Sequence, residues 1–141
     1  MKNRTDRMLL RIFLVSVLIY GILLFVYIQC FWSGTITVPI LDALERPFFL
    51  LAVGGHGVPF FALQLLLCRR KSGGAVLLPI LTVIIPLVSL QGMFGVHGWG
   101  ILTWMVLLRY SIAPAAGSLL ACAVYGIHRL RKKVSQLQGD F

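Results

Sequence analysis

Residues 69–96 read RRKSGG followed by AVLLPILTVIIPLVSLQGMFGV, a basic turn and then an apolar run without Asp, Glu, Lys or Arg. As a helix, the run at 75–96 is long enough to cross a hydrocarbon core of about 30 Å. Three comparable apolar runs occupy residues 12–32, 48–68 and 101–127. The sequence therefore predicts an all-α polytopic membrane protein with one domain, a four-transmembrane-helix bundle that spans residues 1–141.

The composition agrees with lipid as the surrounding solvent. Charged residues make up 12% and apolar residues 59% of the chain, and the mean hydropathy is +0.93. A soluble domain has about twice that share of charged residues. The net charge of +9 does not indicate nucleic acid, because the cations cluster at the ends of the apolar runs, as they do in oriented membrane proteins.

The positions of the basic residues predict the orientation. Four Lys or Arg precede the first run, three lie at 69–71 and four lie in the tail at 128–141, whereas the loops on the other side carry only Arg46. Because cytoplasmic loops are enriched in Lys and Arg, we expect both termini to be cytoplasmic, in the plasma (inner) membrane. The first outer loop, residues 33–47, is expected to contain a short interfacial helix that opens near Pro39.

Three polar residues within the apolar runs are candidates for a ligand site: His56, Gln91 and Arg109. At the rise of a helix, His56 and Arg109 would lie about 12 Å below the outer end and Gln91 about 6–8 Å below it. We expect the three to converge in the outer half of the membrane, with Asp42 and Glu45 covering them from outside.

Two prolines strengthen this expectation. A proline cannot donate to the carbonyl four residues earlier, so Pro59 would free the carbonyl of Gly55 beside His56, and Pro114 would free that of Tyr110 beside Arg109. The stretch GGHGVP at 54–59 has poor helix propensity. It is typical of the broken helices that expose backbone groups in transporters.

Structural roles for the same residues remain open. Arg109 can extend to the outer headgroups or pair with Glu45, and His56 and Gln91 can make ordinary hydrogen bonds between helices. Other sites have less support. The spacing of His56, His97, Asp42 and Glu45 matches no known zinc site, and haem ligation by the two histidines is less favoured still. No nucleophile-elbow motif supports a catalytic set of Ser33, His97 and Asp42. We expect no catalytic residues, no metal and no cofactor.

The last run also carries a candidate helix-packing surface. Ala113, Gly117 and Ala121 recur every four residues, and Ser118, Cys122 and Gly126 form a neighbouring stripe; such stripes let another helix approach closely. Cys30, Cys68 and Cys122 match no disulfide or metal pattern and are interpreted as core residues. Basic residues of the tail are expected to contact anionic lipid headgroups: Arg129, Arg131, Lys132 and Lys133.

Two functions fit these features. The first is a small non-enzymatic accessory or scaffold subunit that binds a larger membrane protein, or further copies of itself, through its helices. The alternative is an oligomeric channel or transporter for an anionic or polar solute, with an outer-half site at Arg109, His56 and Gln91. The accessory role is favoured because polar chemistry within the apolar runs is sparse.

Overall fold

The computed structural model describes residues 4–29, 47 and 50–139, and these residues contain helices and no strands. The helices are α1 (Arg4–Tyr27), α3 (Gly57–Arg69), α4 (Gly74–Gly95) and α5 (Trp99–Gly139), with a π-helical turn, η2 (Leu50–Gly54), before α3. Helices α1, α4 and α5 are long and apolar enough to cross a membrane, whereas α3 has only 13 residues. The expected interfacial helix, Asp42 and Glu45 all lie outside the described residues.

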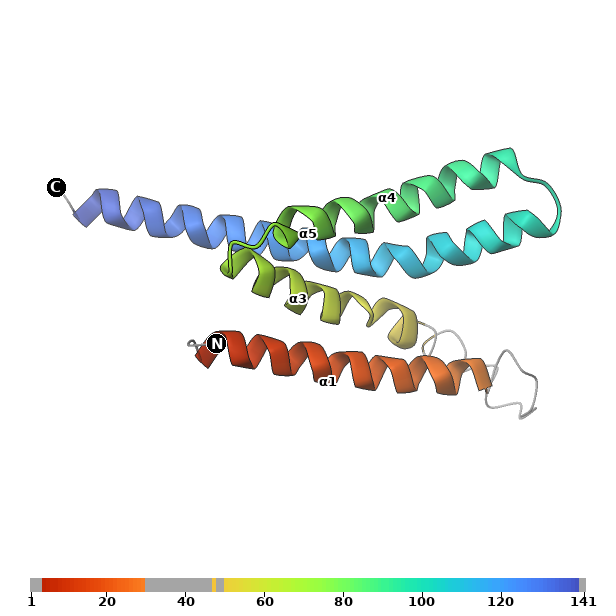
Figure 1. Ribbon diagram of the computed structural model, residues 1–141, viewed down its shortest axis with the longest axis horizontal. Helices are drawn as coiled ribbons and strands as arrows, with labels where there is room; N and C mark the ends of the chain where they lie inside the picture. Colours follow the sequence, from red (N-terminus) through yellow and green to blue (C-terminus); the bar gives the residue numbers. More distant parts are fainter. Residues whose placement is uncertain (1–3, 30–46, 48–49, 140–141) are drawn as a thin grey trace.

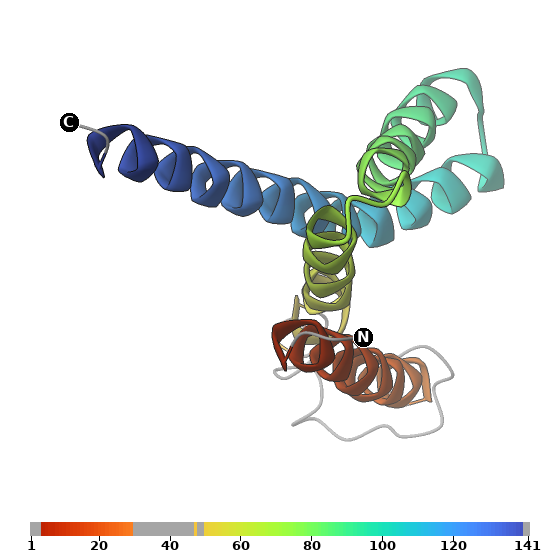
Figure 2. The ribbon, with the colours of Figure 1, turned by 60° about the vertical axis from the view of Figure 1, so that its left-hand side comes forward.

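The helices are arranged in a row rather than around a square. Helix α3 lies between α1 and α5, and α4 packs along the first part of α5, away from α1 (Figure 1 and Figure 2). The last part of α5 extends beyond the other helices (Figure 1). With 41 residues, α5 is roughly 60 Å long, about twice the thickness of a hydrocarbon core.

Helices α4 and α5 form a tight antiparallel hairpin. Gly98 adopts a φ of 74°, which residues with a Cβ rarely adopt, and its carbonyl accepts the N–H of Ile101 at 3.2 Å. A Cβ on Gly92 would lie 2.5 Å from the ring of Trp104, so the absence of a side chain allows the two helices to approach. The short segment between the two predicted runs therefore contains a tight turn between two packed helices.

Small and polar side chains lie inside, and large apolar side chains lie outside. Among the described residues, the buried polar ones include Gln64, Ser89 and Ser118, while Val76, Phe94 and many other large apolar residues are exposed. A water-soluble domain has the opposite distribution and rarely exposes such extended apolar surface. This pattern is consistent with an integral membrane protein.

The helix boundaries differ from the expected runs in three places. Helix α1 begins at Arg4, so it includes basic residues that were assigned to a flanking segment. The run predicted at 48–68 is broken at Gly55 and His56, between η2 and α3, within the stretch 54–59 where the sequence predicts a broken helix. The run predicted at 101–127 continues without interruption to Gly139, so the basic tail is the end of α5 itself. The run at 75–96 agrees with α4 within one residue at each end.

The basic segments gather at one end of the molecule. The start of α1, the turn between α3 and α4, and the far part of α5 all lie toward the same end (Figure 1). Asp6 on α1 accepts a hydrogen bond from Nε of Arg69 on α3 at 3.0 Å, and Nε of Arg70 lies 4.0 Å from the same carboxylate. Of the described Lys and Arg residues, Arg109 is the one outside these segments.

Candidate functional site

His56 lies where η2 ends and α3 begins. Its N–H donates to the carbonyl of Val53 at 3.2 Å, and its ring faces Tyr20 of α1 with ring centroids 6.2 Å apart. Tyr20 also occupies the space where a Cβ on Gly55 would lie. His56 Nδ1 is buried and has no hydrogen-bond partner among the described residues. Tyr20 of α1 therefore packs against the break between η2 and α3.

The prediction that the Gly55 carbonyl, beside His56, has no hydrogen-bond donor is wrong. The Gly55 carbonyl accepts the N–H of Val58 at 3.0 Å. Pro59 lies in the first turn of α3, where N–H groups have no partner within the helix, so a proline there removes no intrahelical bond.

Arg109 and Gln91 are both exposed, on α5 and α4. Gly57, next to His56, contacts Ala113 and Gly117, which come roughly 6 and 12 Å after Arg109 along α5. Gln91 adjoins Gly92, which faces Trp104, about 7 Å before Arg109 along the same helix. His56 and Gln91 thus lie beside different parts of α5, on either side of the level of Arg109. Joint binding of a solute by the three residues stays a prediction.

Helices α3 and α5 cross at two glycines, where their backbones approach closely. A Cβ on Gly117 would collide with the carbonyl oxygen of Gly57, and one on Gly57 would lie 2.9 Å from the carbonyl oxygen of Ala113. Ala121, one turn further along α5, is completely buried. The small residues of α5 therefore face α3 of the same chain.

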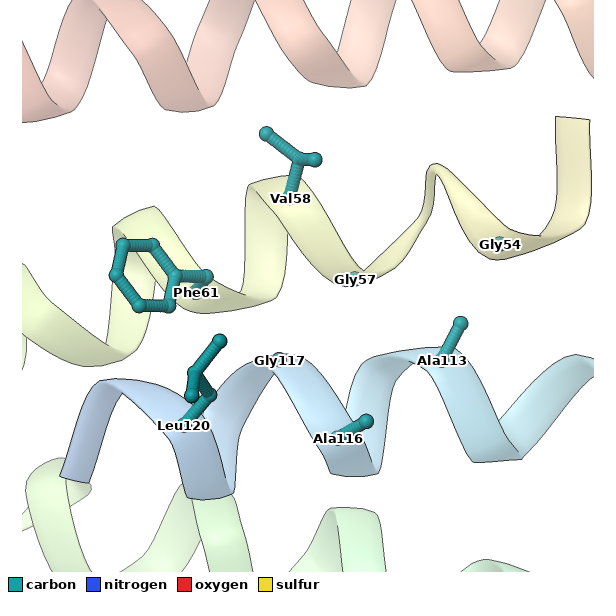
Figure 3. A pocket seen from close by; sticks show the side chains of 8 residues that line it. All are labelled: Gly54, Gly57, Val58, Phe61, Ala113, Ala116, Gly117 and Leu120. Atoms are coloured by element: carbon teal, nitrogen blue, oxygen red, sulfur yellow. The ribbon is translucent and has the colours of Figure 1, made fainter. Parts of the chain in front are cut away.

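An open apolar groove of about 370 Å³ runs along this crossing. Gly57 and Gly117 lie opposite each other, with Phe61 and Leu120 together at one end (Figure 3). The remaining lining residues are Gly54, Val58, Ala113 and Ala116. Because backbone forms its centre, the groove can accept an apolar group at close range.

A buried amide joins three helices and was not among the residues singled out from the sequence. Gln64 on α3 is completely buried, and its Nε2 donates to the carbonyl of Ala75 on α4 at 2.6 Å. The same nitrogen lies 3.1 Å from Sγ of Cys122 on α5 and 3.4 Å from Sγ of Cys68. Its Oε1 has no partner among the described residues.

The reason for this contact is visible in the sequence of α4. Pro79 has no N–H, so the carbonyl of Ala75, four residues earlier, lacks its intrahelical donor. The Gln64 amide supplies that donor from a neighbouring helix. The sequence contains a signal for this contact, namely a proline in one apolar run and a glutamine in another. Which polar side chain meets which carbonyl depends on how the helices are rotated relative to each other, and the sequence does not show this.

A second polar contact fastens α4 to α5. The hydroxyl groups of Thr82 and Ser118 lie 2.7 Å apart, and Ser118 also donates to the carbonyl of Ala115 at 3.0 Å. Both side chains are buried. Together with Gln64, they form a row of buried polar contacts that joins α3, α4 and α5.

The described residues contain no group of three or more His, Cys, Asp or Glu side chains close enough to hold a metal ion. Of the residues considered for zinc, haem or catalysis, His97 lies exposed in the α4–α5 turn, while Ser33, Asp42 and Glu45 fall outside the described residues. No protein-family model, curated protein or solved structure matches the chain.

Proposed function

We propose that the chain is a small integral membrane protein that serves as a non-enzymatic accessory subunit and binds a larger membrane partner through its helices. The basic end, with both termini, faces the cytoplasm. Support for insertion comes from the exposed apolar side chains of α1, α4 and α5. Support for the orientation comes from the common end that the basic segments share (Figure 1).

The observation that carries the accessory role is the open groove between α3 and α5. Its lining is apolar, and two glycines expose backbone at its centre. In lipid, helices associate through close packing at small residues rather than through a hydrophobic driving force. A single helix of a membrane partner, or of a second copy, is the occupant that this surface favours.

A substitution that fills the groove tests this role. Ala116 is exposed and lines the groove, and Ala123 is exposed on α5 outside it. We expect Ala116→Phe to release a stoichiometric partner during purification in mild detergent, because the larger ring occupies the partner's place. Ala123→Phe, the matched control, should retain it. Mass spectrometry of the complex distinguishes a second copy from another protein, and an unmodified chain that purifies as a partner-free monomer overturns the proposal.

The alternative, a channel or transporter for an anionic solute, has less support, since Arg109 and Gln91 are exposed and lie at different levels from His56. Loss of solute binding or flux in Arg109→Leu, with normal expression and normal partner retention, would favour it. Unchanged transport in that variant would exclude it.

A further inference from the structure

A pocket at the basic end is built from three helices. Its volume is about 260 Å³, and its lining comes from the start of α1, the end of α3 and the far part of α5. The lining residues are Asp6, Arg69, Tyr125, His128, Arg129 and Lys132. These helices are remote in sequence, so the pocket is a product of the fold rather than of one charged stretch.

One face of α5 supplies four of the lining side chains. Tyr125, His128, Arg129 and Lys132 have the spacing i, i+3, i+4 and i+7, which places them on one side of a helix. Arg131 and Lys133 belong to the same basic segment but do not line the pocket. The segment is therefore divided into cations that face the pocket and cations that point elsewhere.

The charge inside the pocket favours an anion. Arg69, Arg129 and Lys132 supply three cations against the one carboxylate, Asp6. That carboxylate is already paired with Arg69 and Arg70, and only 17% of its side chain is exposed. Asp6 therefore acts as a support that holds Arg69 at the pocket. The Tyr125 hydroxyl and the His128 imidazole add further hydrogen-bonding groups.

We propose that this pocket binds the phosphate of an anionic lipid headgroup. Arginine and lysine make charge-assisted hydrogen bonds to phosphate oxygens, and basic pockets between membrane helices bind phosphate-rich headgroups at the cytoplasmic side. The pocket lies where α1 begins, where α3 ends and where the apolar part of α5 gives way to its basic part. The acyl chains would therefore lie along exposed apolar helix surface. This inference rests on insertion into the membrane and not on the accessory role.

The test compares two double variants of the full-length protein in neutral detergent. Arg129→Gln with Lys132→Gln removes two pocket cations, and Arg131→Gln with Lys133→Gln removes two cations of the same segment outside the pocket. Glutamine has a helix propensity close to that of both residues, so α5 is preserved. Binding of phosphatidic acid, with phosphatidylcholine as the reference lipid, is measured by native mass spectrometry.

We expect the pocket variant to lose affinity for phosphatidic acid by about tenfold more than the control variant, because charge-assisted bonds are lost only from the pocket. Equal losses in the two variants would overturn the proposal in favour of a diffuse polybasic attraction. Displacement of the lipid by millimolar inorganic phosphate would also overturn the proposal, because it would show that the pocket binds soluble phosphate rather than a lipid headgroup. Failure of this test leaves partner binding in the groove unaffected, so the two proposals fail separately.

Discussion

Gln64 of α3 replaces a hydrogen bond that Pro79 removes from α4. Pro79 leaves the Ala75 carbonyl without its intrahelical donor, and Gln64 provides one at 2.6 Å. In an apolar environment, an unpaired backbone carbonyl costs more than in water. The glutamine is therefore explained by the backbone of its neighbour, with no ligand required.

This explanation predicts an energetic coupling between the two residues. The free-energy cost of Gln64→Leu should be larger with Pro79 present than in a Pro79→Ala background, by about 0.6–1.7 kcal/mol. Alanine at position 79 restores an N–H for the Ala75 carbonyl, so the amide is no longer needed. Reversible unfolding in mixed micelles measures the four proteins of the cycle.

Pro86 provides the control, since it lies in the same helix but the carbonyl four residues before it is not bound by Gln64. Replacing it with alanine should leave the cost of Gln64→Leu unchanged. Equal coupling to both prolines would mean that Gln64 acts through general packing.

At the scale of helices, contact between α3 and α5 depends on the absence of side chains. Gly57 and Gly117 bring two backbones together at a point that a Cβ would block. The break at Gly55 and His56 directly precedes this crossing and receives Tyr20 from α1. Helix α3 is therefore held on both sides, by α5 on one side and by α1 on the other, where Tyr20 lies at its start and Asp6 at its end.

Gly117→Ala should destabilise the protein by about 1–3 kcal/mol, because the new Cβ collides with the Gly57 backbone, which cannot rotate away. Gly126→Ala on the same helix meets nothing within 4 Å and should be neutral or stabilising by about 0.5–1 kcal/mol, since alanine favours a helix. Thermal unfolding in detergent measures both. A Gly117→Ala protein as stable as the parent would contradict the crossing.

For the whole molecule, the sequence predicted the long apolar helices and the position of the α4–α5 turn, because both depend on local composition. It did not predict the row-like order α1, α3, α5, α4, which depends on which helix faces meet. For the same reason it missed Gln64, whose partner lies in another helix. The i, i+4, i+7 spacing of Leu130, Val134 and Leu137 does favour a helical tail, and α5 continues through the basic residues to Gly139.

The relative depths of the candidate site residues also depend on how the helices pack. Counting residues from the ends of the apolar runs put His56 and Arg109 at similar depths, because the count used the rise of a regular helix along the whole of each run. The break before α3 and the contact of Gly57 with Ala113 and Gly117 shift His56 along α5 relative to Arg109. Depth cannot be read from chain position when one helix is interrupted.

In the orientation that we propose, α4 crosses a bilayer and the basic end of the molecule lies in the cytoplasm. Ser72 and His97 are exposed in the turns at its two ends, so each can be replaced by cysteine in a background without Cys30, Cys68 and Cys122. With a membrane-impermeant maleimide, His97→Cys should be labelled in intact cells, and Ser72→Cys only after permeabilisation. Labelling of Ser72→Cys from outside, or equal labelling of both before permeabilisation, would contradict this orientation.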